Sequence, residues 1–328
     1  MNAPSPDTIF NVNSPEEFNA IALDVFTFQY KNNKIYNDFC KHLGKQIDTI
    51  QHYSEIPFLP IEFFKSKQII SNSKLPEITF TSSGTTGLAT SKHHVTDLNI
   101  YKESYTKAFQ HFYDNIADYC ILALLPSYLE RNGSSLIYMA NDFIAKSKHP
   151  DSGFYLDEID ALVHKLKVLN EAGQKVFLLG VSFALLDLAE NHQLNLNHTI
   201  VMETGGMKGR RKEMIRAELH QTLQNGLGVS QIHSEYGMTE LLSQAYSQGN
   251  GLFKTPPWMK ILIRDTEDPL TLLPHQKTGG VNVIDLANVN SCSFIATQDL
   301  GKMHSNESFE ILGRFDNSDI RGCNLMVV

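Results

Sequence analysis

The pattern of hydrophobic and polar positions predicts a helical first part of the chain, over residues 1–75. Ser14-Pro15 is a typical helix start, with a capping hydroxyl and then a proline in the first helical turn. Apolar side chains then recur at helical spacing at Phe18, Ile21, Ala22, Val25 and Phe26. This spacing predicts an amphipathic helix, followed by a second helix over residues 34–43.

From residue 76 onward, short apolar runs alternate with helical patterns. The predicted strands cover residues 78–80, 121–125, 176–180 and 199–202. The predicted helices cover residues 96–112, 156–172, 181–191 and 208–223. An alternation of strand and helix predicts a parallel sheet with helices on both faces, which is an α/β fold.

After about residue 250 the helical patterns stop. Three short runs with strand-like composition follow, at residues 258–264, 280–285 and 293–297, and they predict a smaller β subdomain. We therefore expect three parts. They are a helical N-terminal segment packed on the core (1–75), an α/β region (76–250), and a small β subdomain with a C-terminal tail (251–328).

The composition excludes several classes of protein. Hydrophobic residues make up 42% and charged residues 20% of the chain, as in an ordinary globular protein. The net charge of −8 means that the chain lacks the excess of basic residues that is typical of nucleic-acid-binding proteins. No apolar run approaches the roughly 20 residues of a membrane helix, and the N-terminal residues have no signal-peptide pattern. We expect a cytoplasmic protein with reduced thiols, no nucleic-acid partner and no membrane span.

The strongest chemical signal is a loop of hydroxyl side chains and glycines directly after the predicted strand 78–80. Its residues are Thr81, Ser82, Ser83, Gly84, Thr85, Thr86 and Gly87. Glycines let backbone N–H groups approach an anion, hydroxyl groups bind phosphate oxygens, and Lys92 adds a nearby positive charge. The alternative is a flexible linker. The sequence contains neither the P-loop pattern nor GxGxxG.

A second signal is the sequence His233-Ser234-Glu235-Tyr236-Gly237-Met238-Thr239-Glu240. Tyr236 offers a flat face for a purine ring, Thr239 offers a hydroxyl, and Glu240 offers a carboxylate for Mg²⁺. The alternative is an ordinary turn between a strand and a helix, with Thr239 as the helix cap.

These two loops resemble the adenylate-forming superfamily, which includes acyl-CoA synthetases, firefly luciferase and the adenylation domains of peptide synthetases. Two later elements match in order: Thr297-Gln298-Asp299-Leu300-Gly301 and Gly313-Arg314-Phe315-Asp316. The resemblance implies ATP and Mg²⁺ as cofactors, with Asp299 and Arg314 binding the ribose and Glu240 holding the metal ion. It also implies that Gly205 and Gly206 form a shelf for adenine, and that region 76–250 binds the nucleotide and the acyl group.

One branch of the superfamily, the LuxE-like acyl-protein synthetases, matches further residues. They are the Ile56-Pro57-Phe58-Leu59-Pro60 element with Phe64-Lys65, the Pro126-Ser127-Tyr128-Leu129-Glu130-Arg131 element, and a short tail of 12 residues after Asp316. The shortness of the tail leads us to expect that the superfamily's mobile C-terminal domain is absent. In that branch a fatty acid becomes acyl-AMP, and its acyl group moves to a cysteine near the C-terminus and then to a reductase. The matching position here is Cys323.

The sequence therefore predicts an ATP-dependent acid–thiol ligase. Its substrate is a carboxylic acid, expected to be a fatty acid, its first acceptor is Cys323, and its partner is an acyl-accepting reductase or carrier protein. Two alternatives stay open. They are a ligase that loads coenzyme A or a carrier protein directly, and a non-catalytic nucleotide- or acyl-binding scaffold. A buried position in an apolar terminal strand is the alternative for Cys323.

The remaining histidines and cysteines carry weaker signals. Cys323, Lys92 and His233 are the predicted catalytic residues. His233 is a candidate for acid–base chemistry or for stacking, with a structural role as its alternative. His93 and His94 are expected to be a solvated pair. Cys40 lies in a predicted helix, Cys120 and Cys292 lie in strand-like runs, and all three are expected in the core.

Overall fold

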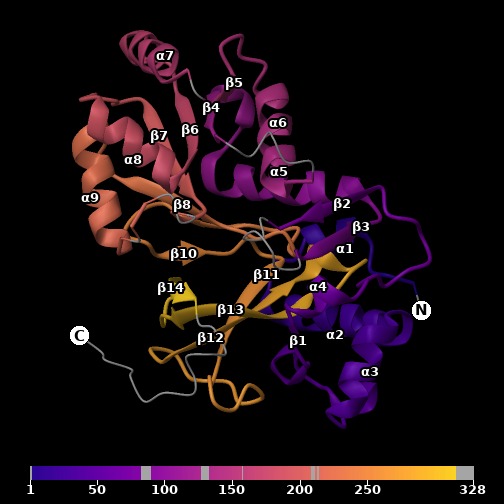
Figure 1. Cartoon of the computed structure of the whole chain (residues 1–328). Coiled ribbons are helices and arrows are strands. Elements are labelled where there is room, and N and C mark those ends of the chain that lie inside the picture. The colour runs from indigo at the N-terminus through magenta and orange to yellow at the C-terminus, as the bar shows by residue number, and fades with distance from the viewer. Residues whose placement is uncertain are drawn as a thin grey trace. The chain divides into compact units, whose positions relative to one another are not determined.

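The computed structural model describes residues 2–82, 90–126, 133–156, 158–207, 211–212 and 214–314 (Figure 1). The chain divides into two compact units. Unit 1 combines Met1–Ser73 with Pro257–Val328, and unit 2 is Lys74–Pro256. The two units are described separately below. The predicted division into three parts stays a prediction.

Unit 2 is built on a mostly parallel sheet, which confirms the predicted α/β class. Five parallel strands lie in the order β5-β4-β6-β7-β8, and antiparallel β9 and β10 continue the sheet beyond β8. Their bounds are β4 Cys120–Leu124, β5 Gly153–Tyr155, β6 Val176–Val181, β7 Thr199–Thr204, β8 Ile232–Tyr236, β9 Ala245–Ser247 and β10 Phe253–Lys254. Every side chain of β4 and β6 is buried, as in a strand covered on both faces.

Helices cover both faces of this sheet (Figure 1). They are α5 Leu98–Tyr113, α6 Ser135–Ser147, α7 Ile159–Glu171, α8 Ser182–Asn191 and α9 Arg216–Leu227, with a short 3₁₀ turn at Ile116–Asp118. Phe177 of β6 packs against Phe109 of α5, with ring centroids 5.1 Å apart. On the other face, Leu185 of α8 fills the space above Gly180, where a Cβ would lie 2.6 Å from its Cγ.

A separate antiparallel pair, β2 (Ile78–Thr81) and β3 (Lys92–Val95), brackets the Ser/Thr/Gly loop. The pattern predicted β2 but not β3, because four residues with two histidines do not show a clear strand alternation. The pattern also missed α6, although Ser134 caps its start by accepting a hydrogen bond from the Ile137 N–H at 3.4 Å.

The predicted helix over residues 208–223 is wrong in its bounds. The observed α9 begins at Arg216 and ends at Leu227, where Gly228 takes a left-handed conformation with φ of +65°. Leu219, Leu223 and Leu227 are all buried along this helix. The position of the helix is therefore set by the burial of these three leucines and not by the polar residues that precede Arg216.

Unit 1 joins an antiparallel sheet near the C-terminus to helices near the N-terminus. Its strands β11 to β14 pair in chain order, and β1 runs parallel to β13, which confirms the predicted small β structure. Their bounds are β1 Leu59–Pro60, β11 Met259–Arg264, β12 Thr278–Asp285, β13 Phe294–Met303 and β14 Phe309–Arg314. The helices are α1 Pro6–Phe10, α2 Pro15–Asn32, α3 Lys34–His42 and α4 Phe63–Ser66, with 3₁₀ turns at Ile47–Thr49, Tyr53–Glu55 and Leu286–Asn288.

The helix start read from Ser14-Pro15 is confirmed, since the Ser14 Oγ accepts a hydrogen bond from the Glu17 N–H at 3.1 Å. The predicted apolar face of α2 is buried, and Phe26 packs against Tyr36 and Phe294. Cys40, Cys120 and Cys292 are buried and free, as predicted for core cysteines. Within the described part of the chain, no helix is both long and apolar enough to cross a membrane.

Gln29 connects α2 to the sheet of unit 1. Its Nε2 lies 3.1 Å from the Asn288 carbonyl oxygen and 2.9 Å from that of Val289, and its Oε1 accepts the Ser293 N–H at 3.0 Å. Replacing Gln29 with leucine leaves these buried groups unpaired, so we expect the free energy of unfolding to fall by about 2–4 kcal/mol. Urea unfolding measures this, and Gln221→Leu on the exposed face of α9 is the control, expected to change little. Equal effects of the two changes would contradict this role of Gln29.

Candidate functional site

The predicted purine and metal residues follow the carboxyl ends of two adjacent parallel strands in unit 2. Gly205 and Gly206 come directly after β7, and Tyr236 ends β8 and leads into Gly237, Thr239 and Glu240. Ligands of open α/β sheets bind outside the carboxyl ends of the strands, so this edge is where a nucleotide is expected. The sheet therefore brings the glycine shelf and the Tyr-Gly-x-Thr-Glu element to the same edge.

The base of the predicted phosphate loop is well defined. Thr81 ends β2, and its N–H donates to the Gly133 carbonyl oxygen at 2.8 Å. The Ser82 Oγ accepts the Ser91 N–H at 2.9 Å. Lys92 is exposed at the start of β3, opposite Thr81. The other loop residues of the prediction, Ser83, Gly84, Thr85, Thr86 and Gly87, lie outside the described residues.

A single histidine connects the two predicted loops. The His93 Nδ1 lies 2.8 Å from the Thr239 carbonyl oxygen, across a sequence separation of 146 residues. The prediction of a solvated His93-His94 pair is wrong for His93, which is only 1% exposed. Alternation along β3 turns His93 inward, while half-buried His94 pairs with the Thr79 Oγ1 at 2.9 Å. His93 therefore holds the phosphate-loop hairpin beside the loop that carries Thr239 and Glu240.

Replacing His93 with leucine tests this connection. The Thr239 carbonyl then loses its partner, and we expect unfolding free energy to fall by about 1–3 kcal/mol. Thermal and urea unfolding of the variant measure the loss. The control is His198→Leu, since His198 is exposed. A His93→Leu protein as stable as the control would show that the contact contributes nothing.

Tyr236 and its neighbours are more enclosed than a freely accessible purine platform. Tyr236 is 9% exposed, and its ring meets that of Phe253 edge-on with centroids 6.1 Å apart. Glu240 is 5% exposed. At Gly237 a Cβ would lie 2.3 Å from the Glu235 Oε1, so a larger residue there would displace the Glu235 carboxyl group. The alternative of Thr239 as a helix cap finds no support, since no helix follows β8 before β9 in this described stretch.

An ionic cluster lies behind the glycine shelf. Glu203, near the end of β7, is 4% exposed and has the Ser182 Oγ at 3.0 Å, His220 Nε2 at 3.5 Å and Arg216 Nε at 3.7 Å. Burial alone raises the pKa of Glu203, but His220, Arg216 and Ser234 outweigh it and the pKa is lowered. The same Ser182 hydroxyl lies 3.2 Å from the Gly205 carbonyl oxygen. An ionised Glu203 thus fixes α8 and α9 against the sheet edge that carries the shelf.

His233 and Glu235 both point to the opposite face of the sheet from Glu203. Burial, with a smaller contribution from His220, lowers the pKa of His233 to about 4, and its Nδ1 lies 3.1 Å from the Tyr113 hydroxyl. His233 is therefore a neutral, hydrogen-bonded ring at physiological pH, and its catalytic role stays a prediction. Burial, with Glu203 adding to it, raises the pKa of Glu235 to about 7, although the hydroxyl of Thr204 donates to this carboxyl.

In unit 1, Asp299 and Arg314 form a pair. They face each other across β13 and β14, and the Arg314 Nε donates to the Asp299 Oδ1 at 3.1 Å. Asp299 is 6% exposed, whereas the Arg314 side chain is 73% exposed. The sheet thus brings together the two residues that the resemblance assigns to the ribose. Cys323 lies outside the described residues.

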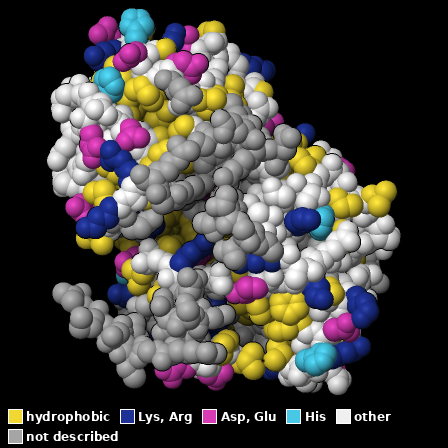
Figure 2. Space-filling view, in the orientation of Figure 1, with side chains coloured by type: hydrophobic (Ala, Val, Ile, Leu, Met, Phe, Trp, Pro, Cys, Tyr) yellow, Lys and Arg dark blue, Asp and Glu magenta, His cyan; other side chains and the backbone are white. Residues whose placement is uncertain are grey.

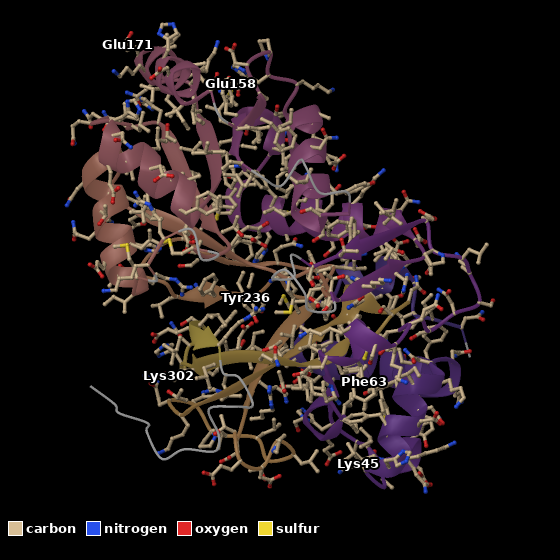
Figure 3. The ribbon with its side chains drawn as sticks, in the orientation of Figure 1. Lys45, Phe63, Glu158, Glu171, Tyr236 and Lys302 are labelled. Atoms are coloured by element: carbon tan, nitrogen blue, oxygen red, sulfur yellow. The ribbon has the colours of Figure 1, made fainter. Side chains whose placement is uncertain are left out.

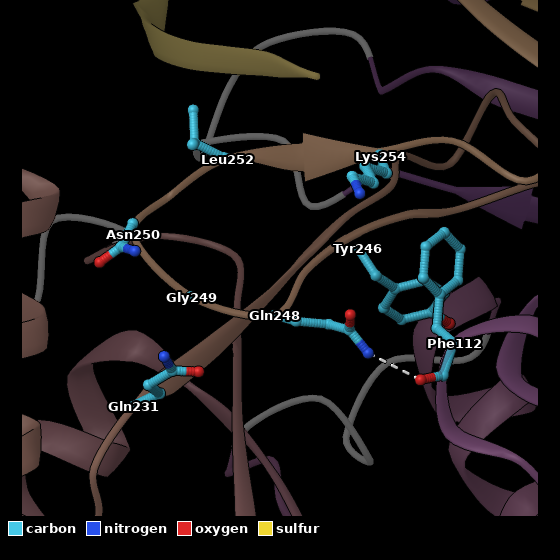
Figure 4. A pocket seen from close by; sticks show the side chains of 8 residues that line it. All are labelled: Phe112, Gln231, Tyr246, Gln248, Gly249, Asn250, Leu252 and Lys254. Atoms are coloured by element: carbon cyan, nitrogen blue, oxygen red, sulfur yellow. Dashed lines mark hydrogen bonds between the residues drawn. The ribbon is translucent and has the colours of Figure 1, made fainter. Parts of the chain in front are cut away.

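On the face that Figure 2 shows, acidic and basic side chains of the described residues are interspersed. A pocket of about 170 Å³ lies in unit 2 and contains none of the predicted site residues. It is lined by Phe112, Gln231, Tyr246, Gln248, Gly249, Asn250, Leu252 and Lys254, and the Gln248 Nε2 donates to the Phe112 carbonyl oxygen at 2.7 Å (Figure 4).

The predicted metal residue, Glu240, is a single carboxylate. Among the described residues, no group of three or more His, Cys, Asp and Glu side chains converges on one point. Mg²⁺ is commonly held by one or two protein carboxylates together with substrate phosphates, so the single carboxylate of Glu240 fits the predicted metal chemistry.

Sequence reasoning missed three residues of this region: His93, Glu203 and Glu235. The available signal for Glu203 was its position directly after the predicted buried strand 199–202, because a buried carboxylate requires partners. Glu235 lies in the His233–Glu240 element, which the sequence did not predict as a strand. No comparable signal existed for the partner of His93, since Thr239 is distant in the sequence.

No family model matches the chain. Among curated proteins, the chain is similar to a long-chain-fatty-acid–luciferin-component ligase from Vibrio harveyi. The two are 24% identical over 327 residues, covering 92% of this chain and 84% of that protein.

Solved structures show the same fold. ATP-bound MatB from Rhodopseudomonas palustris matches with a TM-score of 0.56 at 19% identity, over 72% of this chain and 47% of that one. A 2-hydroxyisobutyryl-CoA ligase, in complex with 2-HIB-AMP and CoA, matches with a TM-score of 0.66 at 11% identity, over 96% of this chain and 75% of that one. This chain therefore spans about half the length of MatB.

The fold is similar to that of these ligases. The similarity to the Vibrio harveyi ligase agrees with the resemblance to the LuxE-like acyl-protein synthetases that the sequence predicts.

Proposed function

We propose that this protein is an acid–thiol ligase that activates a carboxylic acid of the fatty-acid class with ATP and transfers the acyl group to Cys323. The observation that carries the proposal is the contact between His93 and Thr239, which joins the phosphate-loop hairpin to the Tyr-Gly-x-Thr-Glu loop within one unit. Two elements that are far apart in the sequence thus meet at the strand edge where nucleotides bind in α/β folds. The named activity of the Vibrio harveyi relative supports the acid class.

The first half-reaction is adenylation. A carboxylate oxygen of the acid attacks the α-phosphorus of ATP, the bond to the bridging oxygen breaks, and pyrophosphate leaves. Negative charge develops on the leaving pyrophosphate. It is stabilised by backbone N–H groups and hydroxyls of the loop from Thr81 to Gly87 and by Lys92. Glu240 would hold Mg²⁺, which supplies charge neutralisation to the phosphates, and Gly205, Gly206 and Tyr236 would border the adenine.

The second half-reaction transfers the acyl group. The Cys323 thiolate attacks the acyl carbonyl carbon, a thioester forms, and AMP leaves with the electrons of the broken bond. The other thiols support this assignment by their environment. Burial raises the pKa of Cys120 to about 11 and that of Cys40 to about 12, and it also raises the pKa of Cys292. Such buried thiols are inert, which leaves Cys323 as the candidate nucleophile.

The decisive experiment combines ATP–pyrophosphate exchange with intact-mass measurement, using ATP, Mg²⁺ and a panel of alkyl and aryl acids. The proposal predicts exchange with at least one acid and a covalent acyl adduct on the protein that maps to Cys323. Exchange with no acid, in a protein that binds ATP, would make the chain a nucleotide-binding scaffold.

A second candidate is a ligase that loads coenzyme A or a carrier protein directly. The observation in its favour is the fold, which is shared with a CoA ligase over 96% of this chain. Adding coenzyme A to the exchange mixture separates the two candidates. Release of acyl-CoA without any protein adduct supports this second candidate.

The proposed cytoplasmic location and an acyl-accepting reductase or carrier protein as partner remain parts of the first proposal.

A further inference from the structure

A buried carboxyl group lies directly under the turn that leads to Thr239 and Glu240. The Glu235 Oε2 accepts a hydrogen bond from the Thr204 hydroxyl, at the end of the adjacent strand β7. The Glu235 Oε1 approaches the α-carbon of Gly237, within 2.3 Å of the position that a Cβ would take there. The two oxygens of one carboxyl group therefore face the end of β7 and the start of the loop after β8.

Gln244 approaches the same point from the far end of this loop. Its Cγ lies 3.2 Å from the position of a Cβ on Gly237, and its side chain is only 5% exposed. The Gln244 Oε1 is fully buried and has no hydrogen-bond partner among the residues that the structure describes. A buried acceptor of this kind requires a donor, and a carboxylate has none to offer, but a carboxylic acid does.

The surroundings of Glu235 favour the protonated acid. Glu203 on β7 adds like charge, which raises the pKa of Glu235 further. The other titratable groups that interact electrostatically with it are the Tyr101 hydroxyl from α5 and the Tyr246 hydroxyl from β9, and Glu235 raises the pKa of both. On its own strand, the neighbouring His233 is neutral. Burial raises the pKa of Glu235 to about 7, so its carboxyl changes charge within the physiological range.

We propose that Glu235 is a positioning residue, which in its protonated form donates a hydrogen bond to the Gln244 Oε1 while it accepts one from Thr204. This arrangement ties both ends of the loop 237–243 to the end of β7. The loop carries Thr239 and Glu240, so the inference rests on the proposed function for its catalytic consequence. Loss of the proton removes the donor and places a carboxylate against the Gln244 carbonyl oxygen.

The direction of the pH dependence follows from linkage. The pKa of Glu235 in the folded protein lies above its unfolded value, so the protonated group contributes stability at low pH. That stability is lost as the pH rises through about 7. The loop is therefore held firmly at about pH 6 and is looser at about pH 8.5.

Glu235→Gln tests the proposal directly, because a glutamine supplies an N–H donor for Gln244 and an oxygen for Thr204 at every pH. Gln244→Leu removes the acceptor. Glu171→Gln removes the same charge at the exposed end of α7 and serves as the matched control (Figure 3). For each protein, hydrogen–deuterium exchange of a peptide over residues 237–243 is compared with that of a peptide over β6, at about pH 6 and about pH 8.5.

In the wild type and in Glu171→Gln, we expect the loop peptide to exchange roughly tenfold faster, relative to β6, at the higher pH. Glu235→Gln abolishes this difference, and Gln244→Leu exchanges fast at both values. We also expect the KM for ATP to rise roughly threefold from the lower to the higher pH in the wild type and to stay constant in Glu235→Gln.

Two results overturn the inference. A loop exchange profile in Glu235→Gln that matches the wild type at both pH values shows that no such tie exists. A changed exchange profile with an unchanged dependence of KM on pH shows that the tie is structural and does not position the site. If the wild type activates no acid at all, the proposed function fails, while the hydrogen-exchange comparison still decides whether the tie is present.

Discussion

Replacing Cys323 with serine is expected to abolish the acyl adduct on the protein while ATP–pyrophosphate exchange continues. A serine hydroxyl is a far weaker nucleophile than a thiolate at neutral pH, so we expect adduct formation to fall by a factor of about 100 or more. Adenylation precedes the transfer and does not use the thiol, so exchange is expected to stay within about twofold of the wild type. The amount of acyl adduct is determined by intact-mass measurement of the protein after incubation with the acid, ATP and Mg²⁺.

The control for this change is Cys120→Ala, in the fully buried strand β4. Its thiol has a raised pKa and is not expected to carry an acyl group, so the adduct is expected to persist in this variant. A Cys323→Ser protein that still acquires the adduct would exclude Cys323 as the acceptor. Acyl-CoA release by that variant at the rate of the wild type would instead favour a ligase that loads coenzyme A directly.

Replacing Glu240 with glutamine is the second change with a large expected effect, and it acts on adenylation itself. Removing a single group that stabilises transition-state charge costs about 10²–10³ in kcat, and we expect a loss of that size in ATP–pyrophosphate exchange. A glutamine keeps the size of this 5%-exposed side chain, so the fold is expected to remain. Because the amide is a weaker ligand for a hard cation, half-maximal exchange should also require more Mg²⁺.

Glu218→Gln on the exposed face of α9 is the control for this change, and its exchange rate should equal that of the wild type. Thermal unfolding of both variants separates lost chemistry from lost stability. If Glu240→Gln exchanges pyrophosphate within about threefold of the wild type, at unchanged Mg²⁺ dependence, the carboxylate has no part in adenylation.

Local signals in the sequence were reliable where they depend on neighbouring residues. The cap at Ser14 and the apolar spacing after it predicted α2, and the short apolar runs predicted β4, β6 and β7. The prediction of α9 was wrong in its bounds. Its sequence is largely polar, so the sequence alone does not show that the helix begins at Arg216 and buries its leucine side chains against the sheet.

Predictions about polar residues depended more on tertiary contacts. The His93-His94 pair looks like a solvated polar patch, yet strand alternation buries His93 and gives it the Thr239 carbonyl oxygen as its partner. The sequence marks Asp299 and Arg314 only by their motifs, and the register of β13 and β14 makes them a cross-strand pair.

The sequence by itself predicted the α/β fold class and the resemblance to the adenylate-forming enzymes, because the alternation of strands and helices and the order of four short motifs are properties of the linear chain. The tertiary structure decided which polar groups meet. It placed Thr239 against His93, Glu203 among His220, Arg216 and Ser182, and Glu235 between Thr204 and Gly237. The physical reason is that burial and charge neighbours set the protonation of a side chain, and both arise only when strands distant in the sequence pair and helices cover them.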